Sequence, residues 1–467
     1  MKKGEIVEGV IDRYSFPNKG SMVVEGERIS VKGALPGQRV RARVKRNGGN
    51  LTEIVERADY ETDPMCEHFP DCGGCAYQTV PYEKQLEIKK RQIEELIGEA
   101  YPEEFTLENI YASPRPVEYR NKMEFSFGDA VKDGPLTLGL HKRASTYDVL
   151  SVTGCVLVDS DVRKVLETVL VFYAGRDIPY YKKMAHEGIL RHLLVRKSTF
   201  TGQMLVALVS ASGERSYEEL AAYLKLQELT QVLTSQKYDG ELTGFLHILN
   251  NSLADVVVSE KTTLLYGRDY IEEKLLGLTF KITPFSFFQT NAAGAEVLYC
   301  VVRDFLGGER KHIVYDLYSG TGTIAQIVSA VCEKCIGVEI VEEAVIAARE
   351  NAARNAIDNC VFIAGDVLKV IDTMPERPDV LILDPPRDGI HPKALPKLID
   401  YGAQKVIYIS CKPSSFARDL PSFYAAGYRI SRIACVDMFP QTPGVECCCL
   451  LTKCYKGGFW KEPEGGI

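Results

Sequence analysis

The stretch Asp379-Val-Leu-Ile-Leu-Asp384-Pro-Pro-Arg387-Asp-Gly, followed by Val406-Ile-Tyr-Ile-Ser-Cys411-Lys-Pro413, decides the fold of this chain. Residues 380–383 and 406–409 are short runs of branched apolar residues, and about one helix's worth of chain separates them. This pattern predicts a strand–helix–strand unit of a parallel sheet. Ligands bind outside the carboxyl ends of such strands, where Asp384, Arg387 and Cys411 fall. The sequence therefore predicts a chemical site that combines a carboxylate, a guanidinium and a thiol.

Length and composition narrow the function classes. The 467 residues favour two or three domains, and 45% hydrophobic and 25% charged residues are typical of a globular protein. No run of about 18 apolar residues occurs, so we expect no signal peptide, no membrane span and a cytoplasmic protein. The 14 cysteines then indicate metal binding or catalysis in a reducing compartment. A net charge of −7 excludes a uniformly basic nucleic-acid binder, so RNA binding would depend on local patches.

Residues 1–58 read as strands joined by Gly and Pro turns, which predicts a small OB-like β-barrel. On one strand, Arg39, Arg41, Arg43 and Lys45 alternate with small apolar residues and share one face. One interpretation is a solvated edge strand whose charges prevent aggregation. The other is a surface that follows RNA phosphates, which we favour because no acid interrupts the run.

Three cysteines lie close together in Cys66-x5-Cys72-x2-Cys75, and Gly73-Gly74 lets the backbone fold tightly around a metal. Tetrahedral zinc and a four-iron cluster would each need a fourth ligand. Cys155 is a remote fourth ligand of the kind common in iron–sulfur proteins, and His68 is a geometrically awkward alternative for zinc. The spacing therefore predicts a metal site.

The central region also contains an amphipathic helix over residues 82–98, with Leu86, Ile93, Leu96 and Ile97 expected to face inward. Further along, Arg191, His192, Arg196 and Lys197 form a basic cluster. This cluster is either a solvated face or part of an RNA-binding rim.

The last third has the most regular pattern, because five predicted strands each end at a polar or glycine-containing cluster. The strand ends are Asp316 with Gly320-Thr-Gly322, then Glu339, Asp366, Asp384 and Cys411. Glycines allow close approach to a ligand, and an acid after the second strand can bind ribose hydroxyls. This fits a dinucleotide or S-adenosylmethionine, and the downstream cysteine and carboxylate favour S-adenosylmethionine.

Five motifs in this order resemble the RNA uracil-5-methyltransferase family: Phe285-Ser-Phe-Phe-Gln289-Thr-Asn, Asp316-Leu-Tyr318-Ser-Gly-Thr-Gly, Asp384-Pro-Pro-Arg387, Ser410-Cys411-Lys-Pro and Asp437-Met-Phe-Pro-Gln-Thr with Val445-Glu446-Cys. The stretch Val31-Lys-Gly-Ala-Leu-Pro-Gly-Gln-Arg-Val resembles a TRAM module, and the clustered cysteines resemble those of the 23S rRNA branch. The tRNA T-loop branch normally lacks both features.

The resemblance implies an α/β fold of three domains. We expect a TRAM-like RNA-binding barrel over 1–58 and a central α+β iron–sulfur domain over 59–283. Residues 284–467 would form a Rossmann-like, S-adenosylmethionine-dependent methyltransferase domain, on which the helix at 82–98 packs. Cys66, Cys72, Cys75 and Cys155 would hold a 4Fe-4S cluster.

The resemblance also implies the chemistry. Cys411 would attack C6 of uracil, which makes C5 nucleophilic toward the methyl donor, and Glu446 would remove the C5 proton. A positive neighbour, Lys412 or Arg387, would help form the thiolate. The residues expected around the cofactor are Gln289, Tyr318, Glu339 (at the ribose), Asp366 (near the adenine) and Asp384, which could instead contact the uracil.

The expected substrate is 23S rRNA, and the expected protein is a monomer. Alternatives are a tRNA or dual-RNA uracil-5-methyltransferase and, less favoured, a non-enzymatic iron–sulfur RNA-binding protein. Two departures from the family pattern occur: Ser319 replaces a common cysteine, and Pro443-Gly444 replaces a histidine-containing step before Glu446.

Overall fold

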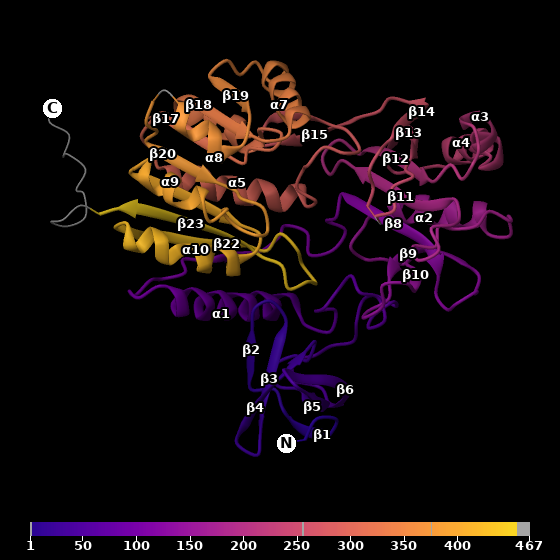
Figure 1. Ribbon diagram of the computed structural model, residues 1–467, viewed down its shortest axis with the longest axis horizontal. Coiled ribbons are helices and arrows are strands. Elements are labelled where there is room, and N and C mark those ends of the chain that lie inside the picture. Colours follow the sequence, from indigo (N-terminus) through magenta and orange to yellow (C-terminus); the bar gives the residue numbers. More distant parts are fainter. Residues whose placement is uncertain (1, 255, 375, 455–467) are drawn as a thin grey trace. The chain divides into compact units, whose positions relative to one another are not determined.

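The computed structural model describes residues 2–254, 256–374 and 376–454 of the chain (Figure 1). It contains two compact units. The first comprises residues 1–63, 79–114 and 294–467, and the second comprises 64–78 and 115–293. The helix that we expected over residues 82–98 is α1 (Tyr82–Ala100), and it belongs to the first unit. Among the described residues, none of the helices has the length and apolar character that a membrane crossing requires.

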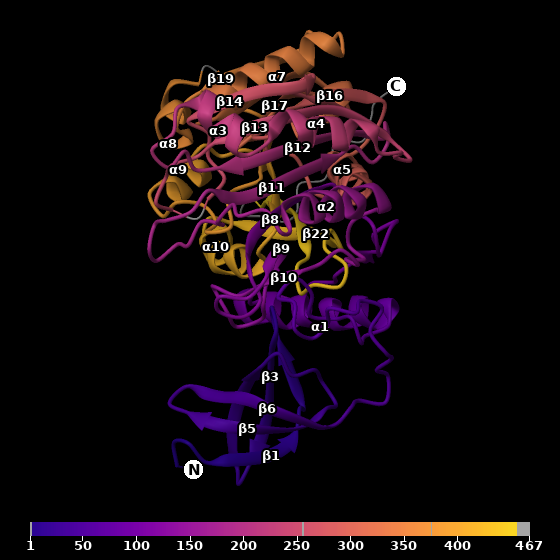
Figure 2. The same ribbon diagram turned by 90° about the vertical axis from the view of Figure 1, so that its right-hand side faces the viewer.

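The N-terminal part of the first unit is a six-stranded sheet, ordered β1-β5-β6-β4-β3-β2, whose strands are grouped together in Figure 2. Its strands are β1 (Ile6–Val10), β2 (Arg13–Ser15), β3 (Lys19–Val24), β4 (Glu27–Lys32), β5 (Arg39–Lys45) and β6 (Gly48–Glu56). A small core that includes Met22, Val31 and Val40 fills its interior. This β-rich region agrees with the sequence expectation.

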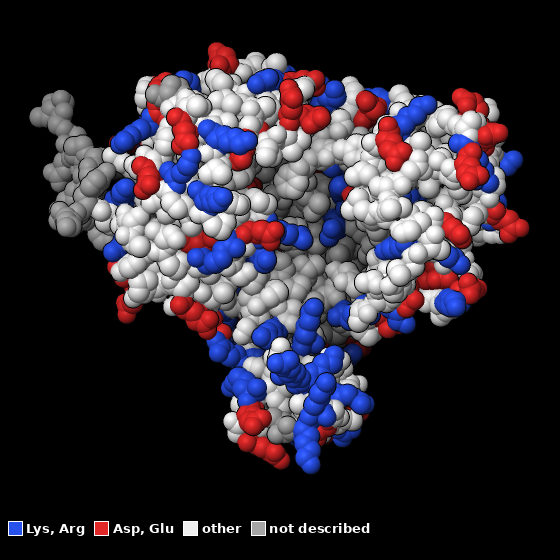
Figure 3. Space-filling view, in the orientation of Figure 1, with Lys and Arg blue, Asp and Glu red and all other residues white. Residues whose placement is uncertain are grey.

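The alternation predicted for β5 is present, because its four basic side chains are exposed while Val40 and Ala42 are buried. The neighbouring strands nevertheless supply acids. Arg41 pairs with Glu8 at 3.0 Å and with Glu53 at 2.7 Å, and Arg39 contacts Glu8 and Glu56 at 3.8 and 3.5 Å. The prediction treated the run as free of acids because these partners are distant in sequence. Lys and Arg side chains still gather over this sheet in Figure 3.

The C-terminal part of the first unit is an eight-stranded sheet in the order β19-β18-β17-β20-β21-β23-β22-β7. Its strands are β7 (Ile110–Tyr111), β17 (Lys311–Leu317), β18 (Cys332–Glu339), β19 (Cys360–Ala364), β20 (Val380–Leu383), β21 (Lys405–Ser410), β22 (Tyr428–Val436) and β23 (Glu446–Lys453). Strands β17 to β21 are parallel, while β23 is antiparallel to both β21 and β22. The predicted strands at 380–383 and 406–409 are thus confirmed as a parallel pair.

The helices of this part are α5 (Ala292–Leu306), α6 (Thr323–Val328), α7 (Glu342–Arg354), α8 (Val367–Val370), α9 (Ala394–Asp400) and α10 (Pro413–Ala425), with 3-10 turns at Ser329–Val331 and Ile371–Thr373. Helix α9 is the connection between β20 and β21 that the sequence predicted. Helix α10 packs against α1, α9 and β21. The result is a mixed α/β architecture in which the strand order reverses at β17 and β20, the place where ligands bind in such sheets.

The second unit is built on a mostly antiparallel sheet, ordered β10-β9-β8-β11-β12-β13-β14, and a hairpin. Its strands are β8 (Lys122–Asp129), β9 (Leu136–His141), β10 (Val149–Ser151), β11 (Leu190–Lys197), β12 (Gln203–Ser210), β13 (Glu241–Leu249), β14 (Lys261–Gly267), β15 (Ile271–Leu275) and β16 (Leu278–Ile282). Its helices are α2 (Ser160–Tyr173), α3 (Tyr217–Tyr223) and α4 (Leu226–Ser235).

The basic cluster on β11 is not a solvated face. Arg191 and Arg196 are 2% and 3% exposed, and each guanidinium donates to backbone carbonyls of distant loops. The nearly buried ammonium of Lys197 pairs with Asp159 and Asp161. Burying a charged group is costly unless it is hydrogen-bonded or paired, and these contacts supply such partners.

Candidate active site

Three of the predicted residues meet at one edge of the eight-stranded sheet. Asp384 follows β20, Cys411 follows β21, and Glu446 opens β23. Because β20 and β21 are parallel, their ends lie side by side, and the antiparallel pairing of Ser410 with Cys447 brings the start of β23 to the same place. Sequence reasoning located the first two by strand ends, and the sheet order adds the third.

The Cys411 thiol lies half-buried among charged groups. Burial, followed by the Glu446 and Asp384 carboxylates, raises its pKa to about 11. Arg387 hydrogen-bonds the sulfur and acts in the opposite direction. Of the two positive neighbours that we predicted, Arg387 is the one that influences the thiol, and it favours the thiolate.

The carboxylates of this site also retain their protons more strongly than usual. Burial, with the charge of Asp384, raises the pKa of Glu446 well above its ordinary value, and Arg387 opposes this. Burial likewise raises the pKa of Asp384 and raises that of Asp316 to about 8. Tyr299 of α5 lies in the field of these three acids and is 4% exposed. Glu446 Oε2 has no hydrogen-bond partner among the described residues, so this oxygen is available to accept a proton.

Three of the expected cofactor residues lie at the ends of β17, β18 and β19. Tyr318 adopts a left-handed backbone (φ 68°), and burial together with the nearby Asp366 raises its pKa to about 12. The Glu339 carboxylate accepts hydrogen bonds from Gly320 N at 3.0 Å and Val341 N at 2.9 Å. Asp366 caps α8 by accepting from Leu368 N at 3.0 Å. These contacts fix the loops that follow the strands.

The glycine-rich turn after β17 is tightly packed. Gly322 has a φ of 71°, and a Cβ there would lie 2.4 Å from the Phe362 ring. Only glycine therefore fits. Asp316 holds the turn through the hydrogen bond from Ala325 N to its Oδ2 (2.9 Å), while its buried Oδ1 lacks a partner in the part of the chain that is described.

Gln289, the remaining predicted cofactor residue, belongs to the second unit. Its backbone carbonyl accepts a hydrogen bond from Asn121 Nδ2 at 3.1 Å. This contact anchors the Phe285–Asn291 motif loop within that unit.

The four predicted metal ligands line one small cavity in the second unit, with a volume of about 20 Å³. Burial, then the charges of Cys155, Cys72 and Cys66, raises the pKa of Cys75 to about 12, and a hydrogen bond from Gln78 opposes this. Within the described residues, no three His, Cys, Asp or Glu side chains stand in a ready metal-binding geometry. The donor set, four thiols around one cavity, suits iron or zinc.

Arg143 holds the cysteine loop in place. Its guanidinium donates to the carbonyls of Pro70 (2.8 Å) and Cys75 (2.5 Å) and lies over the Phe69 ring. Arg143 therefore has a structural role in this loop.

The sequence analysis missed a contact between α1 and the loop before Glu446. Lys89 and Asp437, both 0% exposed, form an ion pair at 2.6 Å. The same ammonium donates to the carbonyls of Gly444 (2.8 Å) and Phe439 (3.3 Å). Burial lowers the pKa of Lys89, and the Asp437 carboxylate opposes that shift. Removing one partner of such a buried pair costs roughly 3–5 kcal/mol.

The buried face of α1 differs from the prediction. Gln85, Lys89 and Gln92 are buried beside Ile93, whereas Leu86 and Leu96 are only half-buried. A spacing of four and three residues between these polar side chains places them on one helix face, and this is the signal that could have identified them.

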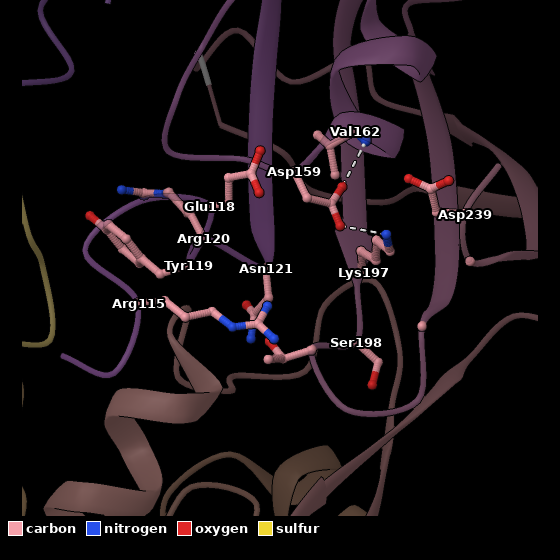
Figure 4. Close-up of a pocket in the computed structure, with 13 residues that line it drawn as sticks. Arg115, Glu118, Tyr119, Arg120, Asn121, Asp159, Val162, Lys197, Ser198 and Asp239 are labelled. Atoms are coloured by element: carbon pink, nitrogen blue, oxygen red, sulfur yellow. Dashed lines mark hydrogen bonds and ion pairs between the residues drawn. The ribbon is translucent and has the colours of Figure 1, made fainter. Parts of the chain in front are cut away.

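Two further cavities of the second unit are lined by residues other than the predicted catalytic, cofactor-binding and metal-binding ones. Figure 4 shows a polar cavity of about 190 Å³ in the second unit, with Arg115, Asn121 and Ser198 on its wall. A cavity of about 400 Å³ in the same unit is lined by residues of β8, β11 and the segment 180–184.

Comparison with known proteins identifies a family model and several relatives that this chain resembles. Residues 198–454 match the family model described as tRNA (Uracil-5-)-methyltransferase. An uncharacterized RNA methyltransferase of Clostridium tetani is 46% identical over 96% of this chain and 97% of its own length. One from Caldanaerobacter subterraneus is 43% identical over 97% of this chain and 100% of its own.

Among solved structures, the Pyrococcus abyssi tRNA (uracil-54, C5)-methyltransferase in complex with S-adenosyl-L-homocysteine is similar with a TM-score of 0.74 and 26% identity. The match covers 96% of this chain and 100% of that one. The site geometry, the family model and these relatives lead to one conclusion: the chain belongs to the RNA uracil-5-methyltransferase family and is an RNA methyltransferase.

Proposed function

We propose that this enzyme transfers a methyl group from S-adenosylmethionine to C5 of a uridine in 23S rRNA, through a covalent bond between Cys411 and uracil C6. The observation that carries the proposal is the meeting of Cys411, Asp384, Arg387 and Glu446 at one sheet edge. A nucleophile, a cation that favours its anion and a buried base are the groups that this chemistry needs.

The protein's part of the reaction begins with the thiolate of Cys411. Its sulfur bonds to C6, and the electron pair of the C5–C6 double bond moves to the C4 carbonyl oxygen, which makes C5 nucleophilic. After C5 is methylated, the Glu446 carboxylate takes the C5 proton. The electron pair of that C–H bond restores the C5–C6 double bond, and the bond from carbon to the Cys411 sulfur breaks.

The cofactor would be held by Tyr318, Glu339 and Asp366, with Gln289 and Asp384 as further contacts. Supporting this, three of these residues follow consecutive parallel strands beside the glycine-rich turn. Bound S-adenosylmethionine would supply a methyl group activated by a positively charged sulfur. Acids are suited to ribose hydroxyls and to a cationic ligand, which supports the assignment.

The substrate assignment to 23S rRNA is supported by the TRAM-like sequence and the cysteine spacing. We propose residues 1–58, 59–283 and 284–467 as the corresponding domains, with RNA binding on the first. A tRNA substrate is the second candidate, because the Pyrococcus tRNA (uracil-54, C5)-methyltransferase matches 96% of this chain. Incubating purified enzyme with both RNAs and mapping 5-methyluridine separates the two.

We also propose that Cys66, Cys72, Cys75 and Cys155 hold a 4Fe-4S cluster with a structural role. Their position around one cavity supports this. Protein purified without oxygen should contain about four irons and four sulfides per chain. One zinc without sulfide would contradict the proposal.

The catalytic proposal is tested with Glu446→Gln. This variant should attack and methylate the RNA but fail to remove the C5 proton, so a protein–RNA band should persist in denaturing electrophoresis. Cys411→Ala is the matched control and should give neither methylation nor adduct. If Glu446→Gln is inactive without an adduct, Glu446 positions the substrate, and Asp384 becomes the next candidate base.

A further inference from the structure

Two side chains of α1, Lys89 and Gln85, hold the segment that leads into Glu446. Lys89 binds Asp437 at the start of this segment and the carbonyl of Gly444 near its end. The ammonium thus connects two points of the segment, and the second is two residues from Glu446. A group with three donors and no acceptor is suited to bind one carboxylate and two carbonyls.

Gln85 makes a second set of contacts with the same segment. Its Nε2 donates to Gln441 Oε1 at 3.1 Å, and its Oε1 accepts from the Gln441 backbone N–H at 2.9 Å. Gln441 has a φ of 67°, a left-handed conformation that is unfavourable for this residue type. The paired amides compensate for that conformation, because they satisfy both the side chain and the backbone of Gln441.

Hydrogen bonds within the segment connect residues close in sequence, such as Phe439 N–H, which donates to Asp437 Oδ1 at 3.3 Å. Thr442 Oγ1 donates to the Phe439 carbonyl at 2.8 Å, and Gly444 N–H donates to Thr442 Oγ1 at 3.2 Å. Gly444 also packs closely on Phe439, since a Cβ there would lie 2.9 Å from the ring. Helix α1 adds charged and amide side-chain contacts between the segment and the rest of the unit, beside the hydrogen bond from Asp437 N–H to the Tyr111 carbonyl at 2.9 Å.

We propose that Lys89 and Gln85 are positioning residues that set Glu446 for removal of the C5 proton. The inference rests on the catalytic role of Glu446 proposed above. The distance from carboxylate oxygen to proton must be correct in the transition state, and an error of 1 Å can cost about 100-fold in rate. The clamp, meaning the contacts of Lys89 and Gln85 with residues 437–444, acts mainly on this late step, because Cys411 follows β21 and makes none of these contacts.

The clamp is tested by measuring the decay of the covalent protein–RNA adduct in a single turnover. Lys89→Met should slow adduct decay by about 10-fold or more, while methyl incorporation into the adduct changes much less. The decay rate constant does not depend on the fraction of folded enzyme, so it separates positioning from simple loss of stability. Lys90→Met, at the exposed neighbouring position, is the matched control and should decay like the wild type.

Gln85→Leu replaces Lys89→Met as the test if Lys89→Met does not fold. This variant removes the two neutral contacts with Gln441 and one with the Val80 carbonyl, and it leaves the ion pair intact. It should slow adduct decay by a few fold. Wild-type decay rates in Gln85→Leu, and in Lys89→Met where that variant folds, would overturn the inference. Methylation by Cys411→Ala without any adduct would instead overturn the proposed function, so the two failures are distinguishable.

Discussion

Cys411 lies among two carboxylates and an arginine, whereas Cys66, Cys72, Cys75 and Cys155 lie mainly among one another. Burial raises the pKa of Cys411, Cys72, Cys75 and Cys155 alike. The two sites differ in what could stabilise the thiolates. At Cys411 a cation, Arg387, already acts on the sulfur. At the second site Arg143 favours the thiolate of Cys72, but it is the last of the influences on that thiol, after burial and the charge of Cys66. The charged neighbours of Cys75 are the other thiols, and each of them makes a further thiolate less favourable.

This difference separates a reacting thiol from metal-binding thiols. A nucleophile must form and lose a bond in each turnover, so moderate and adjustable stabilisation of its anion is sufficient. Thiols that repel one another as anions need a permanent positive partner, and a metal centre is such a partner. The comparison therefore predicts opposite consequences for removing a thiol at each site.

The largest effects are expected from removing single thiols. Cys411→Ala should reduce methyl transfer to the background level while folded protein and iron content stay normal. Cys75→Ser should reduce iron content and folded protein first, because the proposed cluster would contribute to folding. Circular dichroism, iron analysis and methyl incorporation per folded enzyme distinguish the two variants. If Cys75→Ser keeps its fold but loses only chemistry, the contrast between the sites is wrong.

A roughly tenfold effect is expected in the reactivity of Cys411. With a pKa of about 11, only about one thiol in a thousand is ionised at pH 8, and alkylation should increase about tenfold per pH unit up to pH 10. Asp384→Asn removes a negative neighbour and should lower the thiol pKa, so alkylation at pH 8 should be faster. Arg387→Gln should have the opposite effect. Mass spectrometry of the Cys411 peptide after iodoacetamide treatment reports both changes, and equal rates in all three proteins would contradict the electrostatic account.

The sequence predicted the parallel strands and the site at their ends, because runs of branched residues and polar strand ends are local signals. Residues 380–383 are a strand with the predicted bounds, and Cys411 and Asp384 lie where a parallel sheet places strand ends. The sequence did not predict the clamp. Lys89 has its partner 348 residues away, and hydrophobic periodicity assigns a lysine to the solvent side.

The same limit applies to the buried arginines of β11. Arg191 binds carbonyls about sixty residues further along the chain, and Arg196 binds Pro284. A charged residue is read as exposed unless its partners are known, and those partners are set by tertiary structure. Most of the features that the sequence did not predict are therefore charged side chains whose partners are close in space but distant in sequence.

The smallest expected effect concerns the six-stranded N-terminal sheet, where the basic face of β5 divides into two halves. Arg39 and Arg41 are paired with acids of β1 and β6, whereas the described part of the chain contains no salt bridge of Arg43 or Lys45. A paired guanidinium must give up its carboxylate to bind a phosphate, so the unpaired half should contribute more to RNA affinity. Arg43→Ala with Lys45→Ala should weaken binding about three- to tenfold and reduce the slope of log affinity against log salt by about 1–2.

Arg39→Ala with Arg41→Ala is the matched control. It removes the same charge from the same strand but frees Glu8, Glu53 and Glu56, whose ion pairs are exposed to solvent and contribute little to stability. We expect this control to reduce the salt slope less than the first double variant does, with the unfolding temperature of both measured alongside. Equal salt slopes in the two double variants would show that the ion pairs of Arg39 and Arg41 do not reduce the contribution of these arginines to RNA binding. An unchanged slope in both would make β5 a solvated edge strand, and RNA binding would then have to depend on another surface.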